Sequence, residues 1–469
     1  MAGYFNIGES KVRPGAYFNV QTNGDDLSYG AIDGVVAVLF QADMGPLGEA
    51  RVLSASDGYM KTYGTGGTTD AIREALYGGA SRIVACRVGT GGTAPSAELE
   101  AATGKLKVTA KEVGAASYRV TVRTKLADST KKEIVFYIGE TEVEKYSFTA
   151  TGDEVAAAIA AAADSPRFTL TAASSGAGVI TNVSQTPLTG GVNPTVNAAA
   201  YSAALEEIEK HYFNVIVADT TDASVHALIA AFLNRIYEAG QFGMAVLAPA
   251  STETLVNRET AAAAFNAENV IYPVNPSAYA GDTLLSGYQV AAYIGGLVAA
   301  TPSNSSVTHV VMSRYTALGE LLTNTQIEDA ESKGCVVLTT NNDGAVWLDN
   351  AVNTLINPDS NHDSGWKKIR RVKARYELLY RANAAADAMV GQVDNDVNGR
   401  ATIATQIQTV CNAMVDEGKL QYAEVTESTS ITANGDTCGF DIDVIDLDSA
   451  EHIYLTYYFR FSTLLESGE

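Results

Sequence analysis

The sequence predicts a layered α/β fold with a β-rich domain inserted into it, and three observations support this prediction. Short continuous apolar runs, beginning with residues 35–40, alternate with helical patterns, which is typical of a largely parallel sheet covered by helices on both faces. Residues 96–195 instead alternate polar and apolar side chains, as half-buried antiparallel strands do. The length of 469 residues is enough for about three domains.

These patterns divide the chain into parts. The predicted parts are an N-terminal arm at 1–30, a discontinuous α/β domain at 31–95 and 196–365, an inserted β-rich domain at 96–195, and a C-terminal α+β domain at 366–469 that ends in a strand arm. The N-terminal arm is rich in turn formers and has one strand-like piece at 16–20.

In the α/β domain we expect strands at the apolar runs and helices where apolar residues recur every three or four positions. The expected strands are 35–40, 82–88, 213–218, 243–248, 270–274 and 335–338. The expected helices are 56–63, 68–77, 201–211, 222–240 and 287–300. The last is predicted to be a buried helix of small residues, because its apolar stretch is shorter than the about 20 residues that span a membrane.

The same spacing of apolar residues predicts the helices and strands of the other two domains. The insertion is expected to contain strands at 105–109, 118–122, 133–137 and 168–171, and an Ala-rich helix at 153–163. The C-terminal domain is expected to open with a long helix from Trp366 and to continue with a helix at 400–417 and strands at 422–427, 438–447 and 453–461.

Composition excludes several classes of protein. The chain has 32 basic and 54 acidic residues and a net charge of −22, which repels phosphate backbones, so nucleic-acid binding is not expected. Charged residues make up only 18% of the chain, which leaves uncharged surface that suits burial against other subunits. The four cysteines, Cys86, Cys335, Cys411 and Cys438, are too scattered for a disulfide scaffold or a zinc pair. Together with the lack of a signal-peptide pattern, this predicts synthesis in a reducing cytoplasm and no insertion into a membrane.

Two features resemble enzyme sites but favour structural explanations. Residues 64–70, Gly-Thr-Gly-Gly-Thr-Thr-Asp, resemble a phosphate-binding loop, yet Thr69 replaces the third glycine and no Walker lysine follows. A glycine turn in which Thr68 or Thr69 caps the next helix is favoured. The five histidines are dispersed and no Gly-x-Ser-x-Gly elbow accompanies them, so neither a catalytic triad nor a zinc site is expected.

Two acidic stretches have spacings that suit a cation. Residues 394–399 match the start of a calcium loop, but Thr405 stands where that loop needs a bidentate Glu, so a turn and helix cap is favoured. The second is a row of aspartates on a predicted strand: Asp441, Asp443, Asp446 and Asp448. Alternation places the first two on one face, which we interpret as solvated, although close carboxylates also suit a cation or a basic partner.

The strongest charge feature is a basic stretch that opens the C-terminal domain. Six of the nine residues from 367 to 375 are basic: Lys367, Lys368, Arg370, Arg371, Lys373 and Arg375. At helical spacing Ile369, Val372 and Tyr376 form an apolar stripe, which leaves the cations on the remaining face. That face is either solvated or meets an acidic surface from another copy or another protein.

Several short pieces occur in a fixed order along nearly the whole chain. They are 13–18 (Arg-Pro-Gly-Ala-Tyr-Phe), 34–38, 44–48 (Met-Gly-Pro-Leu-Gly), 54–59, 71–79, 84–88, 393–400 and 453–456 (Ile-Tyr-Leu-Thr). In this order they resemble the contractile tail sheath protein of bacteriophages and of phage-tail-like bacteriocins. No single piece is specific, and the order carries the resemblance.

The resemblance implies an α/β sheath domain, subtilisin-like in topology but without a protease site, a protruding β-rich insertion, and a C-terminal domain nearest the tail tube. It implies a structural protein without enzymatic activity or cofactor, which polymerises around the tube as stacked hexameric rings and contracts to drive the tube through a cell envelope. The implied partners are further copies of the chain, the tail tube protein, and baseplate and tail terminator proteins. The implied location is a virion tail or phage-tail-like particle, assembled in the host cytoplasm.

Arms at both termini of such proteins add strands to the sheets of neighbouring subunits, by backbone pairing at an open edge. The residues to which this role carries over are Ala16, Tyr17, Phe18, Asn19, Val20, Ile453, Tyr454, Leu455, Thr456, Tyr457, Tyr458 and Phe459. The basic stretch 367–375 becomes a candidate contact with the tube or with another subunit. The alternative is an α/β hydrolase-like enzyme with a β-rich insertion, which would use Asp and His side chains.

Overall fold

The computed structural model describes residues 3–4, 17–18, 33–54, 58–360 and 362–459. Its central sheet has six strands: β3 (Val35–Phe40), β4 (Ala50–Ser54), β5 (Arg82–Arg87), β12 (Val215–Ala218), β13 (Met244–Val246) and β14 (Val270–Ile271). Their order is β14-β13-β12-β3-β5-β4, and all neighbours are parallel except the edge pair β4–β5. Every residue of β3 is buried, which explains its continuous apolar sequence.

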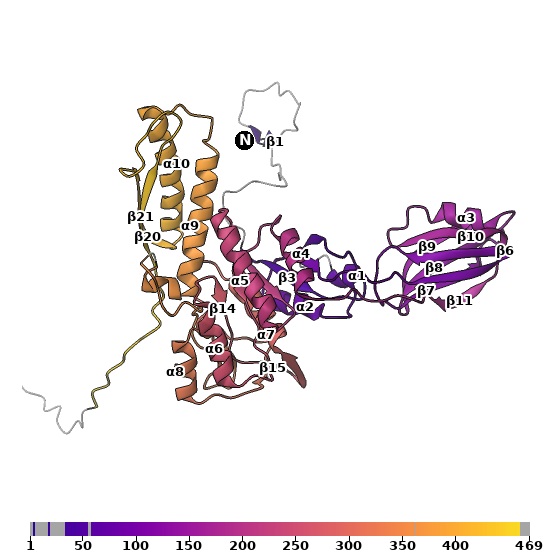
Figure 1. The fold of residues 1–469 in the computed structure, drawn as a ribbon, viewed down its shortest axis with the longest axis horizontal. Helices are drawn as coiled ribbons and strands as arrows, with labels where there is room; N and C mark the ends of the chain where they lie inside the picture. The colour runs from indigo at the N-terminus through magenta and orange to yellow at the C-terminus, as the bar shows by residue number, and fades with distance from the viewer. Residues whose placement is uncertain (1–2, 5–16, 19–32, 55–57, 361, 460–469) are drawn as a thin grey trace, which may run out of the picture.

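Helices cover both faces of this sheet (Figure 1). Even-numbered residues of β3 face one apolar core and odd-numbered residues face the other, because successive strand residues point to opposite sides. The first core includes α1 (Tyr59–Tyr63), α2 (Asp70–Tyr77) and α7 (Gly287–Ala300). The second includes α4 (Ala198–Ile208), α5 (Ala223–Glu238), α6 (Leu255–Phe265) and α8 (Asn324–Ser332).

Helix α7 confirms the prediction of a buried helix of small residues, and its glycines have a packing role. A Cβ on Gly296 would lie 2.1 Å from the carbonyl oxygen of Ala75 on α2, and a Cβ on Gly78 would lie 2.1 Å from the carbonyl oxygen of Tyr293. The two helices therefore pack backbone against backbone, at a separation that no larger residue permits at these positions.

The insertion builds a separate β-rich body that projects from the central sheet (Figure 1). Its elements are β6 (Ser96–Ala110), β7 (Tyr118–Thr124), β8 (Lys131–Ile138), β9 (Thr141–Thr149), α3 (Glu154–Ala161), β10 (Phe168–Ile180) and β11 (Val183–Pro187). They form an antiparallel pair β10–β6 and a four-stranded sheet β11-β7-β8-β9 around one apolar core. The expected strands lie within these elements, and the Ala-rich helix expected at 153–163 is formed over 154–161. Asp153 caps α3 by accepting hydrogen bonds from two backbone N–H groups.

Two small sheets complete the central region. They are built from β15 (Ser277–Ala280), β16 (Thr283–Ser286) and β17 (Ala317–Leu318), and from β18 (Leu338–Thr340) and β19 (Val346–Leu348). The strand expected at 335–338 begins only at Leu338, although Val336 forms a single parallel bridge with Pro273. Strands this short have too few residues to show a period of two in the sequence.

The C-terminal region is a helical pair packed against a hairpin. Its elements are the 3-10 turn η1 (Ser364–Lys367), α9 (Ile369–Asp387), α10 (Val397–Asp416), β20 (Leu420–Glu427) and β21 (Phe440–Asp446). Ile369, Val372 and Tyr376 are buried in the first core of the central sheet, as the apolar stripe predicts. A fourth core, which includes Leu378 of α9 and Met414 of α10, joins the helices to the hairpin.

Candidate assembly interfaces

Residues 453–459, which we call the C-terminal arm, are described as extended chain away from the body of the subunit (Figure 1). Its large side chains are exposed: Ile453, Tyr454, Leu455, Tyr457, Tyr458 and Phe459, up to 94% for Phe459. No hydrogen bond joins the arm to any other part of the chain that the structure describes. The expected strand at 453–461 is therefore absent as a strand within residues 453–459, because a strand needs an edge to pair with.

The N-terminal arm is described at two points. Tyr17–Phe18 is the strand β2, and it pairs in parallel with β1 (Gly3–Tyr4). Ala16, Asn19 and Val20 lie outside the described residues. Two residues of the strand-like piece expected at 16–20 are thus paired, and their partner is another piece of the same arm. Pairing of this piece with a neighbouring subunit stays a prediction.

The predicted basic helix is α9 with the turn that precedes it, and each of its six cations has a partner within the chain. Four of them meet residues 446–451, the segment that precedes the C-terminal arm and that we call its root. Arg371 donates from Nε (3.0 Å) and Nη2 (2.6 Å) to Asp446, Arg370 donates to Ser449 Oγ (3.1 Å), and Lys368 forms an ion pair with Glu451. The root thus lies along α9.

The fourth of these, Arg375, and the remaining two cations also join α9 to its surroundings. Arg375 donates to Asp446 (2.8 Å) and Asp363 (3.0 Å) and lies over the ring of Trp366 at 4.5 Å. Lys367 donates to the carbonyl oxygen of Ile356 (2.7 Å). Lys373 donates to the carbonyl oxygens of Val298 (2.6 Å) and Thr301, at the C-terminal end of α7. A contact of these cations with a tube or another subunit stays a prediction, and an acidic partner already lies in the same chain.

The pKa shifts around α9 agree with these contacts. Burial raises the pKa of the Asp446 carboxyl, but the hydrogen bonds from Arg371 and the charge of Arg375 outweigh it and hold the pKa below its usual value. The hydrogen bond from Arg375 likewise lowers the pKa of Asp363. Burial lowers the pKa of Lys373 to about 8. Asp446, Asp363 and Lys373 are therefore charged in their contacts at neutral pH.

A groove of about 670 Å³ runs between α9 and the hairpin, and we call it the arm groove. Its apolar lining includes Leu378, Leu379 and Ala382 of α9 and Ile442 and Val444 of β21. Strand β21 pairs only with β20 among the described strands, so its second edge, beside this groove, has no backbone partner there. The predicted solvated face is also present, because Asp441 and Asp443 are exposed whereas Phe440 and Val444 pack on the fourth core.

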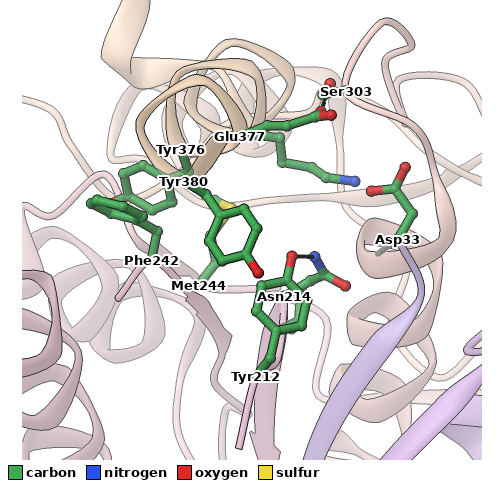
Figure 2. A pocket seen from close by; sticks show the side chains of 11 residues that line it. Asp33, Tyr212, Asn214, Phe242, Met244, Ser303, Tyr376, Glu377 and Tyr380 are labelled. Carbon is green, nitrogen blue, oxygen red and sulfur yellow. Dashed lines mark hydrogen bonds between the residues drawn. The ribbon is translucent and has the colours of Figure 1, made fainter. Parts of the chain in front are cut away.

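A second pocket lies where α9 crosses the amino ends of β3, β12 and β13 (Figure 2). Asp33, Tyr212, Asn214, Ser303 and Tyr380 line it, with a volume of about 40 Å³. Burial raises the pKa of Asp33, whereas the positive charge of Lys373, which lines the same pocket, lowers it. A space of this size holds a water molecule or two and no substrate.

The crevice beyond the carboxyl ends of β3 and β12 is where a doubly wound α/β enzyme would bind its ligand. Here the chain fills it with its own groups. Asp219 is 6% exposed and accepts hydrogen bonds from Gln41 N (3.0 Å), Tyr201 Oη (2.5 Å) and Thr68 Oγ1. The glycine loop that resembles a phosphate site therefore aims Thr68 at a carboxylate, an unsuitable neighbour for phosphate.

The remaining candidates are structural as well. Asp396 caps α10 by accepting from Gly399 N (2.7 Å), and the Asn395 amide donates to two carbonyl oxygens, so this turn is the favoured helix cap. His226 is buried against the carbonyl oxygen of Thr220, and the ring of His309 stacks on Trp347 at 3.9 Å. Within the described residues no cluster of His, Cys, Asp and Glu is arranged to hold a metal ion, and no helix there is long and apolar enough to span a membrane.

The sequence did not predict which carboxylates contact the basic residues of α9. Asp446 was one of four aspartates interpreted together, and nothing in the sequence distinguishes it from Asp441 or Asp443. Glu451, Asp363 and Asp33 lack any motif. The one available signal was charge balance: a stretch with six cations inside an acidic chain requires carboxylates nearby.

Comparisons with known proteins agree with the fold. A model described as the phage tail sheath protein beta-sandwich domain matches residues 90–193, and one described as the phage tail sheath protein central domain matches residues 195–354, so together they cover more than half of the chain. Among curated proteins, the uncharacterized protein YqbK of Bacillus subtilis (strain 168) is 23% identical, with 96% of this chain and 98% of YqbK covered.

Solved structures share the architecture at low identity. A sheath tail protein from Desulfitobacterium hafniense superposes with a TM-score of 0.71 at 21% identity, over 92% of this chain and 100% of that one. A sheath tail protein from Listeria innocua gives 0.70 at 21% identity, over 89% and 96%. The contracted helical sheath of the anti-feeding prophage gives 0.53 at 12% identity, over 96% and 99%. With the two domain matches, these likenesses show that the chain belongs to the phage tail sheath proteins, a family of structural proteins of contractile tails and not of enzymes.

Proposed function

We propose that this chain is a sheath subunit that polymerises around a tail tube as stacked hexameric rings, linked by exchanged strands, and contracts to drive the tube through a cell envelope. The observation that carries the proposal is that one molecule has both an unpaired arm and a site that fits it. The arm is residues 453–459, and the site is the arm groove beside the free edge of β21.

The arm and the groove match in length and chemistry. The arm has seven residues, as β21 does, and an extended strand of that length spans about 23 Å. In such a strand Ile453, Leu455, Tyr457 and Phe459 share one face. That face would cover the apolar wall of the groove while the backbone pairs with β21, which is recognition by strand addition.

The occupant we propose is the C-terminal arm of a second copy. In the described chain the arm runs away from its own body (Figure 1). None of residues 453–459 lines the arm groove. Each large apolar side chain transferred from water into such a groove contributes about 1.5–3 kcal/mol before the cost of ordering the arm. A two-stranded hairpin also gains from added strands, because isolated pairs are marginal in water.

The wider assembly is proposed by analogy with related sheath proteins. Chains with this fold were solved in the baseplate of the anti-feeding prophage (TM-score 0.52) and in the contracted sheath of an extracellular contractile injection system (TM-score 0.55). We propose the corresponding partners for this chain: the tail tube protein, and baseplate and tail terminator proteins, in a particle assembled in the host cytoplasm. The subtilisin-like topology and the domain boundaries are part of the same proposal.

An intermolecular disulfide tests the arm and groove pairing. Chains with Tyr457→Cys and chains with Leu379→Cys are mixed under assembly conditions and oxidised, and cross-linked dimers are counted on a non-reducing gel. We expect dimers that contain one of each variant. The matched control replaces Leu379→Cys by Val397→Cys, at an exposed position outside the groove lining. Equal cross-linking to both positions contradicts the pairing.

A further inference from the structure

We propose that α9 anchors the root of the C-terminal arm to the body of the subunit, so that tension on that arm reaches the central sheet through this helix, which is also tied to the point where β3 begins. The inference rests on the proposed exchange of arms, and it assigns the basic residues of α9 a role inside the subunit. The observations concern the C-terminal root, the start of β3, and the attachment of α9 itself.

The C-terminal root is fixed to α9 along its whole length, and the fixed segment stops where the arm begins. Asp446 meets Arg371 and Arg375, Ser449 meets Arg370, and Glu451 meets Lys368. The chain order of the root thus runs opposite to that of the helix. Glu451 also accepts from the hydroxyls of Ser306 (3.3 Å) and Thr308 (3.0 Å) of the central region. From residue 453 onwards the described chain has no such contact.

These contacts are of a kind that resists pulling. Arg371 binds Asp446 through two parallel hydrogen bonds, the geometry in which a guanidinium binds a carboxylate most strongly. The Asp446 side chain is only 8% exposed, so salt screens the pair less than it screens a surface pair. Lys368 and Arg370 add two further points of attachment within the next five residues of the root.

The start of β3, which follows the predicted N-terminal arm, is tied to the same helix through α7. Gly34 N donates to the carbonyl oxygen of Ala299 (2.9 Å), and Lys373 of α9 donates to the carbonyl oxygens on either side, those of Val298 and Thr301. Asp33 lines the same small pocket as Lys373 (Figure 2). The cation of Lys373 thus caps the end of α7 at the point where β3 begins.

Helix α9 is in turn fixed to the rest of the subunit. Its apolar stripe lies in the core of the central sheet. Glu377 accepts hydrogen bonds from Ser303 (2.5 Å) and Lys419 (2.7 Å) and forms an ion pair with Arg381 (2.5 Å). The carboxylate of Glu377 therefore holds α9 to the loop after α7 and to the start of the hairpin. Tension on the C-terminal arm passes to α9 at Lys368 and Arg371, and from α9 to the sheet.

The test measures the root in the isolated subunit, before assembly. The double variant Asp446→Ala/Glu451→Ala and the 469-residue parent chain are digested briefly with chymotrypsin, and the trimmed products are identified by intact mass. In the parent we expect cleavage within the arm, at Tyr454 to Phe459, and protection of Leu447. In the variant we expect cleavage after Leu447 to be at least about tenfold faster, which corresponds to roughly 1.4 kcal/mol of lost attachment.

The control is Glu209→Ala, which removes a bidentate pair with Arg235 at 2.8 and 2.7 Å, neither of whose residues contacts the root. It should leave cleavage at Leu447 unchanged. The charge swap Arg371→Asp/Asp446→Arg should restore protection if the pairing itself holds the root. If the double variant does not fold, as judged by circular dichroism, Asp446→Asn/Glu451→Gln keeps the side-chain shapes and takes its place. Unchanged cleavage after Leu447 in the folded variant overturns the anchor.

Failure of the anchor is distinguishable from failure of the proposed function. The proteolysis uses single subunits and does not depend on polymerisation. A chain with a released root that still polymerises, but whose sheaths break between rings more readily than the parent when sheared, supports both proposals. Subunits whose root is protected as expected, but which never polymerise, keep the anchor and contradict the assembly.

Discussion

Arg371 binds Asp446 through two hydrogen bonds of 3.0 and 2.6 Å. The two residues are 75 positions apart in the sequence, so this pair joins helix α9 to strand β21. Both partners belong to stretches with opposite charge, the basic α9 and the acidic end of β21. Although the chain has a net charge of −22, the charges of these two stretches neutralise each other within one subunit. The segment that this pair fixes leads directly into the exposed arm.

The pair makes the stability of the C-terminal region depend on acid pH. Asp446 has a pKa below its usual value in the folded state, so its contribution is complete above the unfolded pKa of about 3.9 and is lost as pH falls through the folded pKa. We expect Asp446→Asn to lower the free energy of unfolding by about 1–2 kcal/mol at pH 7, because two arginines lose a charged acceptor. Urea unfolding at pH 7 and at pH 3 measures this. A difference between the proteins that does not shrink at pH 3 contradicts it.

The raised pKa of Glu331 predicts the opposite dependence of stability on pH from that of Asp446. Burial, and then the negative charge of Asp349, raise its pKa to about 7. Between about pH 4.5 and 7 the folded chain keeps on Glu331 a proton that the unfolded chain has already released. This group therefore makes the fold less stable as pH rises through that window. We expect Glu331→Gln to stabilise the protein by about 1 kcal/mol at pH 8, after allowing for solvent screening, and by much less at pH 5. Thermal or urea unfolding at both pH values checks this, and an equal effect at the two values contradicts it.

The contact between α2 and α7 predicts a steric effect. Gly296→Ala would place a Cβ 2.1 Å from the backbone oxygen of Ala75, so one of the two helices must move. We expect a loss of about 1–3 kcal/mol in the free energy of unfolding. Gly295→Ala is the matched neighbour, because its Cβ would meet a side-chain methyl of Val217 at 2.6 Å, and a methyl moves more easily than a backbone. A larger loss at Gly295 than at Gly296 is the outcome that contradicts this packing.

The local pattern of apolar residues was sufficient to predict helices with one apolar face and strands formed by a continuous apolar run. The buried run of β3, the small-residue helix α7 and the stripe Ile369, Val372 and Tyr376 all lie where the periods place them. Short strands such as β17 and β19 were missed, because two or three residues inside turn-rich chain carry no period.

The partners of the basic helix could not be predicted, because pairing over 75 residues is decided by the packing of α9 against the hairpin and not by spacing. Both charged stretches are visible in the sequence. From the sequence we expect the cations to face solvent or an acidic surface of another copy or another protein. The strand expected at 453–461 is not formed within residues 453–459, because a strand without an edge beside it stays single in one subunit, and its pairing with another copy stays a prediction.

Assembly of a truncated chain tests the central claim most directly. The 469-residue chain and a chain that ends at Glu451, which keeps the root and removes the arm, are compared by negative-stain electron microscopy and by sedimentation velocity. The account predicts tubes or rings for the first, and folded monomers with an unchanged melting temperature for the second. Tubes of equal length and number from the truncated chain would contradict assembly through the arm.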